Sequence, residues 1–128
     1  MTPPRLLVID DEPAVRAVWC EFLSLLGYDV EAAQDGADGL ARLARERFDL
    51  VVTDLRMSHL NGWDVLESAR EIAPGMPVIM LTGTATDEDL ERARAHGVRL
   101  FSKPLTLQGL KAAVRDALAH QRGVGSSG

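Results

Sequence analysis

Four groups of side chains that could do chemistry follow short apolar runs in this sequence. Two adjacent carboxylates, Asp10 and Asp11, follow the first run, and a third carboxylate, Asp54, ends another. A hydroxyl, Thr82, and an amine, Lys103, end two later runs. Carboxylates gathered at one place repel one another by roughly 4 kcal/mol per pair at about 4 Å and an effective dielectric near 20, so they need protons or a cation.

A divalent cation suits such a cluster. Mg²⁺ prefers oxygen ligands and completes its coordination shell with water, so two or three carboxylates are enough to bind it. The Lys103 amine, the Thr82 hydroxyl and the Gly83 amide would add positive charge and hydrogen-bond donors, which stabilise a transferring phosphoryl group. Carboxylates form acyl phosphates, so Asp54 is the candidate nucleophile.

The apolar runs that carry these groups have the character of strands. Residues 50–53 are too few for a helix and rich in β-branched side chains, which predicts a strand buried on both faces at the centre of a parallel sheet. Similar runs lie at 5–9, 76–81 and 98–102, and a weaker, alternating run at 28–33 suits an edge strand. Because ligands bind at the carboxyl ends of parallel strands, we expect the polar groups to converge there.

Amphipathic segments alternate with the strands. Helices are expected from Pro13 to a stop at Gly27, from 36 to 47, from the 58–62 loop to about 73, from 87 to 96, and from 107 to near His120. Five alternations imply a mainly parallel sheet with helices on both faces. The main apolar side chains of the first four helices are expected to be Val15, Val18, Trp19, Phe22, Leu26, Leu40, Leu43, Ala44, Val65, Leu66, Ala69, Ile72, Leu90, Ala93 and Ala95.

Composition bounds the class of protein. The 128 residues, 46% of them hydrophobic, fit one domain over 5–121, followed by a flexible tail or linker at 122–128. A net charge of -5 disfavours direct nucleic-acid binding, and a single cysteine, Cys20, excludes an internal disulfide. With neither a signal peptide nor a membrane span in the sequence, a cytoplasmic protein is expected.

Over about residues 5 to 121 the chain resembles the receiver domain of two-component response regulators. The residues that carry the resemblance are Asp10, Asp11, Asp54, Thr82, Lys103 and Pro104. The resemblance implies a flavodoxin-like, doubly wound (βα)5 fold with strand order 2-1-3-4-5. It also implies a signalling protein that catalyses only its own phosphorylation and dephosphorylation.

The resemblance assigns partners and the metal ligands. Asp54 would accept a phosphoryl group from a histidine kinase or histidine phosphotransfer protein, and altered binding of a downstream partner or output domain would pass the signal on. Asp11, Asp54 and the backbone carbonyl of Arg56 would bind Mg²⁺, with Asp10 assisting through water. The chain would be either a single-domain regulator or the receiver of a larger protein.

The resemblance also assigns the remaining roles. Lys103 would bind the phosphoryl group, Thr82 would move to hydrogen-bond it, and the Lys103–Pro104 peptide bond would be cis, an isomer that bonds preceding proline adopt cheaply. Two positions depart from the family pattern. Ser58 stands where a proline is usual, and Leu100 stands where an aromatic residue commonly reports phosphorylation, while Phe101 should point to the opposite face.

Other interpretations remain open from the sequence. Taken singly, Asp10 and Asp11 could favour a helix N-terminus, and Thr82 could be a capping hydroxyl. A phosphorylation-independent receiver, acting only as a protein-binding module, is the main alternative function. A flavodoxin-like electron carrier and an aspartyl phosphatase are weaker alternatives. Trp63 is expected near the site and partly exposed, where its fluorescence could report Mg²⁺ binding.

Overall fold

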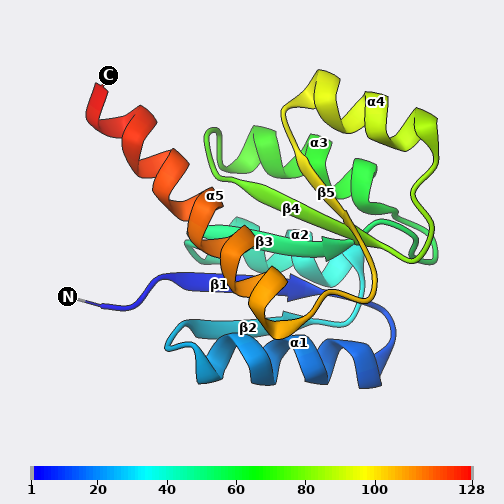
Figure 1. The fold of residues 1–128 in the computed structure, drawn as a ribbon, viewed down its shortest axis with the longest axis horizontal. Helices are drawn as coiled ribbons and strands as arrows, with labels where there is room; N and C mark the ends of the chain where they lie inside the picture. The colour runs from blue at the N-terminus through cyan, green and yellow to red at the C-terminus, as the bar shows by residue number, and fades with distance from the viewer. Residues whose placement is uncertain (1, 128) are drawn as a thin grey trace.

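The computed structural model describes residues 2–127, with side chains described up to residue 119. Strands and helices alternate along the chain (Figure 1). The elements are β1 (Arg5–Ile9), α1 (Pro13–Leu25), β2 (Asp29–Ala33), α2 (Gly36–Arg45), β3 (Leu50–Asp54), α3 (Gly62–Ile72), β4 (Val78–Thr82), α4 (Asp87–His96), β5 (Arg99–Ser102) and α5 (Leu107–Ser127).

The five strands form one parallel sheet in the order β2-β1-β3-β4-β5, which confirms the predicted doubly wound, flavodoxin-like fold. β3 is the central strand and all five of its residues are buried, as its continuous apolar run predicted. β2 lies at one edge of the sheet, in agreement with its alternating sequence.

Successive strand residues face opposite sides of the sheet and build two cores. On one side, Leu7, Val51 and Met80 pack with side chains of α2, α3 and α4. On the other, Val52 and Ile79 pack with side chains of α1 and α5. Helices therefore cover both faces, and the carboxyl ends of the strands remain uncovered along one edge.

Several predicted core positions are wrong. Val18, Ile72 and Leu90 are 44%, 41% and 41% exposed, and Ala44 and Ala95 are also exposed. Val18 and Ala44 lie at the margin of a buried stripe, each one residue from a buried side chain, Trp19 and Leu43, and Ile72 is the last residue of α3. In α1 the deeply buried residues are Trp19 and Leu23, four residues apart on one helix face.

Helix ends follow local sequence signals. Asn61 with Asp64, and Thr86 with Asp89, form reciprocal capping boxes that start α3 and α4, and Gly97 ends α4 in the left-handed conformation. The helix α5 extends to Ser127, past its predicted end near His120. The predicted tail at 122–128 lies outside the residues whose side chains are described, so its flexibility stays a prediction. No helix in the described part of the chain is long and apolar enough to cross a bilayer.

Gly62 lets α3 begin directly against the strand end that carries Asp54. A Cβ atom at this position would lie 3.0 Å from the Leu55 Cα and 3.1 Å from the Asp54 carbonyl oxygen, both backbone atoms. We expect Gly62→Ala to lower the free energy of unfolding by about 2 kcal/mol, because backbone cannot give way as a flexible side chain can. Urea denaturation measures this loss.

Gly83→Ala is the matched control, since a Cβ atom there would meet nothing within 4 Å. Equal losses of stability in the two variants would contradict the steric explanation.

Candidate functional site

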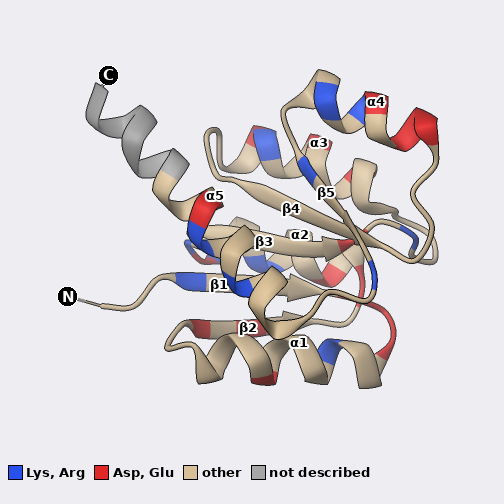
Figure 2. Cartoon of the chain, viewed as in Figure 1, with Lys and Arg blue, Asp and Glu red and all other residues tan. Residues whose placement is uncertain are grey.

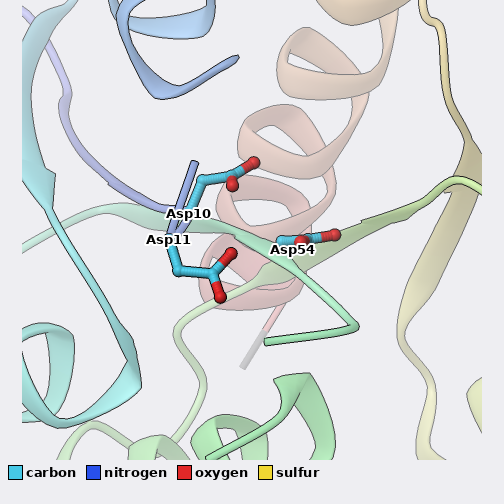
Figure 3. Close-up of side chains that lie close together, drawn as sticks. All are labelled: Asp10, Asp11 and Asp54. Carbon is cyan, nitrogen blue, oxygen red and sulfur yellow. The ribbon is translucent and has the colours of Figure 1, made fainter. Parts of the chain in front are cut away.

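Three carboxylates meet at the carboxyl edge of the sheet (Figure 3). β1 and β3 are adjacent and pair Ile9 with Thr53, so the next residues along each strand, Asp10 and Asp54, emerge side by side. Asp10, Asp11 and Asp54 each offer an oxygen within 4.8 Å of the others. Asp10 and Asp54 are buried, at 2% and 6% exposure, while Asp11 is partly exposed.

Lys103 joins two of these carboxylates. It follows β5, two strands away from β3, and its Nζ lies 3.2 Å from Asp54 Oδ1. The same amine donates a hydrogen bond of 3.3 Å to Asp10 Oδ2. The Lys103 backbone N–H donates a hydrogen bond of 2.7 Å to the Thr82 carbonyl. This bond holds the Lys103 backbone against the end of β4.

The cluster is short of positive charge. Burial raises the pKa of Asp54, Lys103 opposes that rise, and the neighbouring charges of Asp10 and Asp11 add to it. Burial by itself would lower the pKa of Lys103, but Asp54 and Asp10 outweigh burial and raise it, so the amine stays charged. One cation for three carboxylates leaves the site attractive to a further cation.

The donor atoms fit Mg²⁺. Within the described residues the cluster is made of carboxylate oxygens alone, and oxygen-only sites suit hard cations such as Mg²⁺ better than Zn²⁺. Arg56 and Asp11 line an adjoining open cleft of about 580 Å³. Such a cleft has room for the waters that Mg²⁺ retains.

Thr82 and Gly83 lie at the end of β4, but Thr82 does not point its hydroxyl to Asp54. The Thr82 hydroxyl is fully buried and donates to the Thr84 carbonyl at 3.2 Å, while accepting from the Thr84 N–H at 3.4 Å. Gly83 is exposed in the loop that follows. The hydroxyl would therefore have to leave its own loop to act at Asp54.

The two departures from the family pattern have distinct surroundings. Leu100 is half-buried on the side of the sheet that α2, α3 and α4 cover, and Phe101 packs on the opposite side, as predicted. The Lys103–Pro104 bond is cis, which confirms that expectation. Ser58, in place of proline, donates its backbone N–H to Asp11 Oδ2 at 3.2 Å.

The capping interpretation of Asp10 holds only in part. Asp10 Oδ1 accepts a hydrogen bond of 2.9 Å from the Glu12 N–H at the start of α1, while its other oxygen contacts Lys103.

The exposure predicted for Trp63 is wrong. Trp63 is 6% exposed, with the Arg92 guanidinium 4.8 Å from its ring centroid, and it is not among the residues that line the cleft.

Sequence reasoning missed two interactions around the site. The sequence identifies Ser58 only as a departure from the family pattern and does not predict its hydrogen bond to Asp11. A proline at this position could not donate that bond. Arg56 pairs through its side chain with Asp89, a buried carboxylate of α4. The Thr86-to-Asp89 spacing signals a capping box, but no local pattern pairs residues 33 positions apart.

Neutralising Asp54 should stabilise the metal-free protein. Because the pKa of Asp54 is raised in the fold, ionisation of this carboxyl at neutral pH costs stability. We expect Asp54→Asn to raise the free energy of unfolding by about 1 kcal/mol at pH 7. The gain should shrink as pH falls and the wild-type carboxyl becomes protonated.

Denaturation curves at pH 7 and pH 4 measure the effect. Asp116→Asn, which changes an exposed carboxylate of α5 outside the site, controls for net charge. A gain for Asp54→Asn that is unchanged between the two pH values would contradict the electrostatic cause.

Comparisons with known proteins agree with this geometry. A family model described as "Response regulator receiver domain" matches residues 6–115. The chain is 39% identical over 117 residues to the transcriptional regulatory protein GlrR of Escherichia coli K12, covering 91% of this chain but 26% of GlrR. It is 36% identical over 107 residues to the sensor protein EvgS of the same organism, covering 83% of this chain and 9% of EvgS.

A solved structure is similar along almost its whole length. The chain aligns with a response regulator receiver domain protein (CheY-like) from Methanospirillum hungatei JF-1 at a TM-score of 0.89 and 30% identity, covering 94% of this chain and 98% of that one.

Proposed function

The chain belongs to the response regulator receiver domain family of two-component signalling, and from this premise we propose that Asp54 accepts a phosphoryl group in a Mg²⁺-dependent reaction. One observation carries the proposal. The Lys103 amine lies 3.2 Å from Asp54 and 3.3 Å from Asp10, beside a third carboxylate, at the open edge of the sheet. A charged amine and a buried nucleophile are thereby brought together where a donor can approach.

In the proposed reaction an Asp54 carboxylate oxygen attacks phosphorus. The new bond is the acyl phosphate P–O bond, and the bond that breaks is the P–N bond of a phosphohistidine, whose imidazole leaves with the electron pair and takes a proton from solvent. Lys103, already in contact with Asp54 Oδ1, supplies positive charge to the phosphoryl oxygens. Thr82 and the Gly83 amide are proposed as further donors, once the Thr82 hydroxyl turns from Thr84.

The cation is proposed to bind Asp11, Asp54 and the Arg56 carbonyl, with Asp10 assisting through water. Mg²⁺ would supply charge neutralisation between the carboxylates and the incoming phosphoryl group. Ser58 keeps Asp11 oriented, because its N–H occupies Asp11 Oδ2 and leaves the other oxygen of that carboxylate for a metal.

The relatives suggest the partners. GlrR is named a transcriptional regulatory protein, and EvgS is named a sensor protein, and this chain spans about a quarter of the first and a tenth of the second. We propose that this chain acts in the cytoplasm, with a histidine kinase or histidine phosphotransfer protein as donor and a downstream protein partner or output domain as target. Direct binding of nucleic acid or membrane by this chain is not proposed.

Intact mass tests the proposal. The protein is incubated with acetyl phosphate and Mg²⁺, and we expect the mass of one phosphoryl group to be gained. Asp54→Ala and a wild-type sample with excess EDTA should gain none. Phosphoryl uptake that persists in either control would contradict the assignment of Asp54 or of the metal.

Two observations favour a second function, a binding module that works without phosphorylation. The Thr82 hydroxyl is engaged in its own loop, and Leu100 has no ring to report a change at the site. Folded wild-type protein that binds Mg²⁺ yet gains no phosphoryl group would favour this second function.

A further inference from the structure

A long-range ion pair links the loop after Asp54 to α4. Arg56 lies in the β3–α3 loop, and its guanidinium contacts Asp89 Oδ2 on the first turn of α4. Asp89 is 7% exposed although it belongs to a helix whose other acids in that turn, Asp87 and Glu88, are exposed. Figure 2 shows the acidic start of this helix.

Asp89 forms hydrogen bonds with both Thr86 and Arg56. Its Oδ2 accepts the Thr86 N–H at 3.2 Å as well as the Arg56 guanidinium, and its own N–H donates to the Thr86 hydroxyl at 3.0 Å. Burial would raise the pKa of Asp89, but the Thr86 hydrogen bonds and Arg56 lower it. Asp89 therefore stays ionised at neutral pH, and a buried carboxylate depends on its partners.

Few residues of α4 are buried. Only Asp89 and Ala93 are buried among the ten residues of this helix. Ala93 is a small side chain near the centre, so the first turn is attached chiefly through Asp89. A change in the position of Arg56 would thus act on the start of α4 and on the β4–α4 loop, which follows Thr82.

We propose that Arg56 and Asp89 form a coupling pair that transmits the state of the Asp54 site to the N-terminal turn of α4. The inference rests on the proposed function, because it assigns the Arg56 backbone to the metal site. Arg56 would then have two roles: its backbone carbonyl is proposed to bind the cation, and its guanidinium contacts Asp89 of α4. Loading the site shifts the Arg56 backbone, and the ion pair carries that shift to Asp89.

This route needs no aromatic side chain in β5. Leu100 is half-buried in the core on the α4 side of the sheet and has no polar tip to exchange partners. The coupling pair instead runs over the carboxyl edge of the sheet, from the end of β3 to the start of α4. The first turn of α4 is accordingly where we expect loading of the site to alter the surface of the protein.

Asp89→Asn is the decisive variant. Asparagine keeps a side-chain oxygen that can accept the Thr86 N–H, but it loses the charge that pairs with Arg56. Amide spectra are recorded with and without beryllofluoride and Mg²⁺, and intact mass after acetyl phosphate is measured on the same samples. We expect phosphoryl uptake as in the wild type, with beryllofluoride-induced shifts at residues 86–90 reduced at least about twofold.

Three further variants separate coupling from general structure. Asp87→Asn removes an acid from the same helical turn that forms no ion pair with any described residue, and it should keep the full shifts. Arg56→Gln should reduce the shifts as Asp89→Asn does, and Arg56→Lys should restore part of them. A merely structural role would alter the unloaded spectrum without altering the response to loading.

Failure of the coupling pair and failure of the proposed function would give different results. Wild-type shifts at 86–90 in Asp89→Asn, or equal losses in Asp87→Asn, would overturn the coupling pair while leaving phosphorylation of Asp54 intact. Wild-type protein that gains no phosphoryl group would overturn the proposed function and, with it, this inference.

Discussion

Replacing Asp11 with asparagine should weaken Mg²⁺ binding by about 100-fold. Asp11 is the most exposed of the three clustered carboxylates and the one that lines the adjoining cleft, so it is the carboxylate that an entering cation meets. The substitution keeps the shape of the side chain and an oxygen, but removes the negative charge that a hard cation requires. Isothermal titration calorimetry with Mg²⁺ measures the change.

Glu12→Gln is the matched control for this prediction. Glu12 lines the same cleft and carries the same charge, but it is exposed and lies outside the carboxylate cluster. We expect it to weaken binding no more than about twofold, through the general field of the site. Equal losses in the two variants would mean that Mg²⁺ responds to the acidity of the cleft rather than to a ligand.

Replacing Lys103 with methionine should slow phosphoryl uptake from acetyl phosphate by about 10²- to 10³-fold at saturating Mg²⁺. The loss of one preorganised hydrogen-bond donor aimed at developing negative charge has an effect of this size in other enzymes. Lys103 also neutralises Asp10 and Asp54, so the variant leaves two buried carboxylates without that partner. Rates are measured by intact mass over time.

Folding must be separated from chemistry in that variant. Circular dichroism and Mg²⁺ titration establish whether Lys103→Met retains its fold and its metal, and Lys103→Arg retains the charge for comparison. Lys111→Met, which removes the other lysine of the chain from α5, should react at the wild-type rate. A Lys103→Met variant that folds, binds Mg²⁺ and reacts normally would remove Lys103 from the mechanism.

The arrangement of the sheet was predictable because burial on both faces leaves a strong mark on sequence. The runs that became β1, β3 and β4 are continuous and apolar, and a polar residue that marks the carboxyl edge ends each run or follows it directly. Convergence of Asp10, Asp54 and Lys103 then followed from parallel strands. The strand order itself was predicted from the resemblance to a family, since local sequence patterns do not determine which strands are neighbours in the sheet.

The helix faces were harder to predict. Val18 and Ala44 each adjoin a buried residue, and an apolar side chain at the margin of a stripe can turn toward solvent without breaking the 3.6-residue period. The contacts of Arg56 with Asp89 and of Ser58 with Asp11 could not be predicted, because they join loops that only the finished fold brings together. Sequence therefore predicted the chemical groups better than their supporting contacts.

The most direct test of the central claim is to locate the phosphoryl group. Protein treated with acetyl phosphate and Mg²⁺ is reduced with borohydride, which converts an aspartyl phosphate to homoserine, and the peptides are analysed by mass spectrometry. We predict homoserine at position 54 alone, and none in protein treated with EDTA. Homoserine at Asp10 or Asp11, or a phosphoryl group on a serine, threonine or histidine, would contradict the assignment of Asp54.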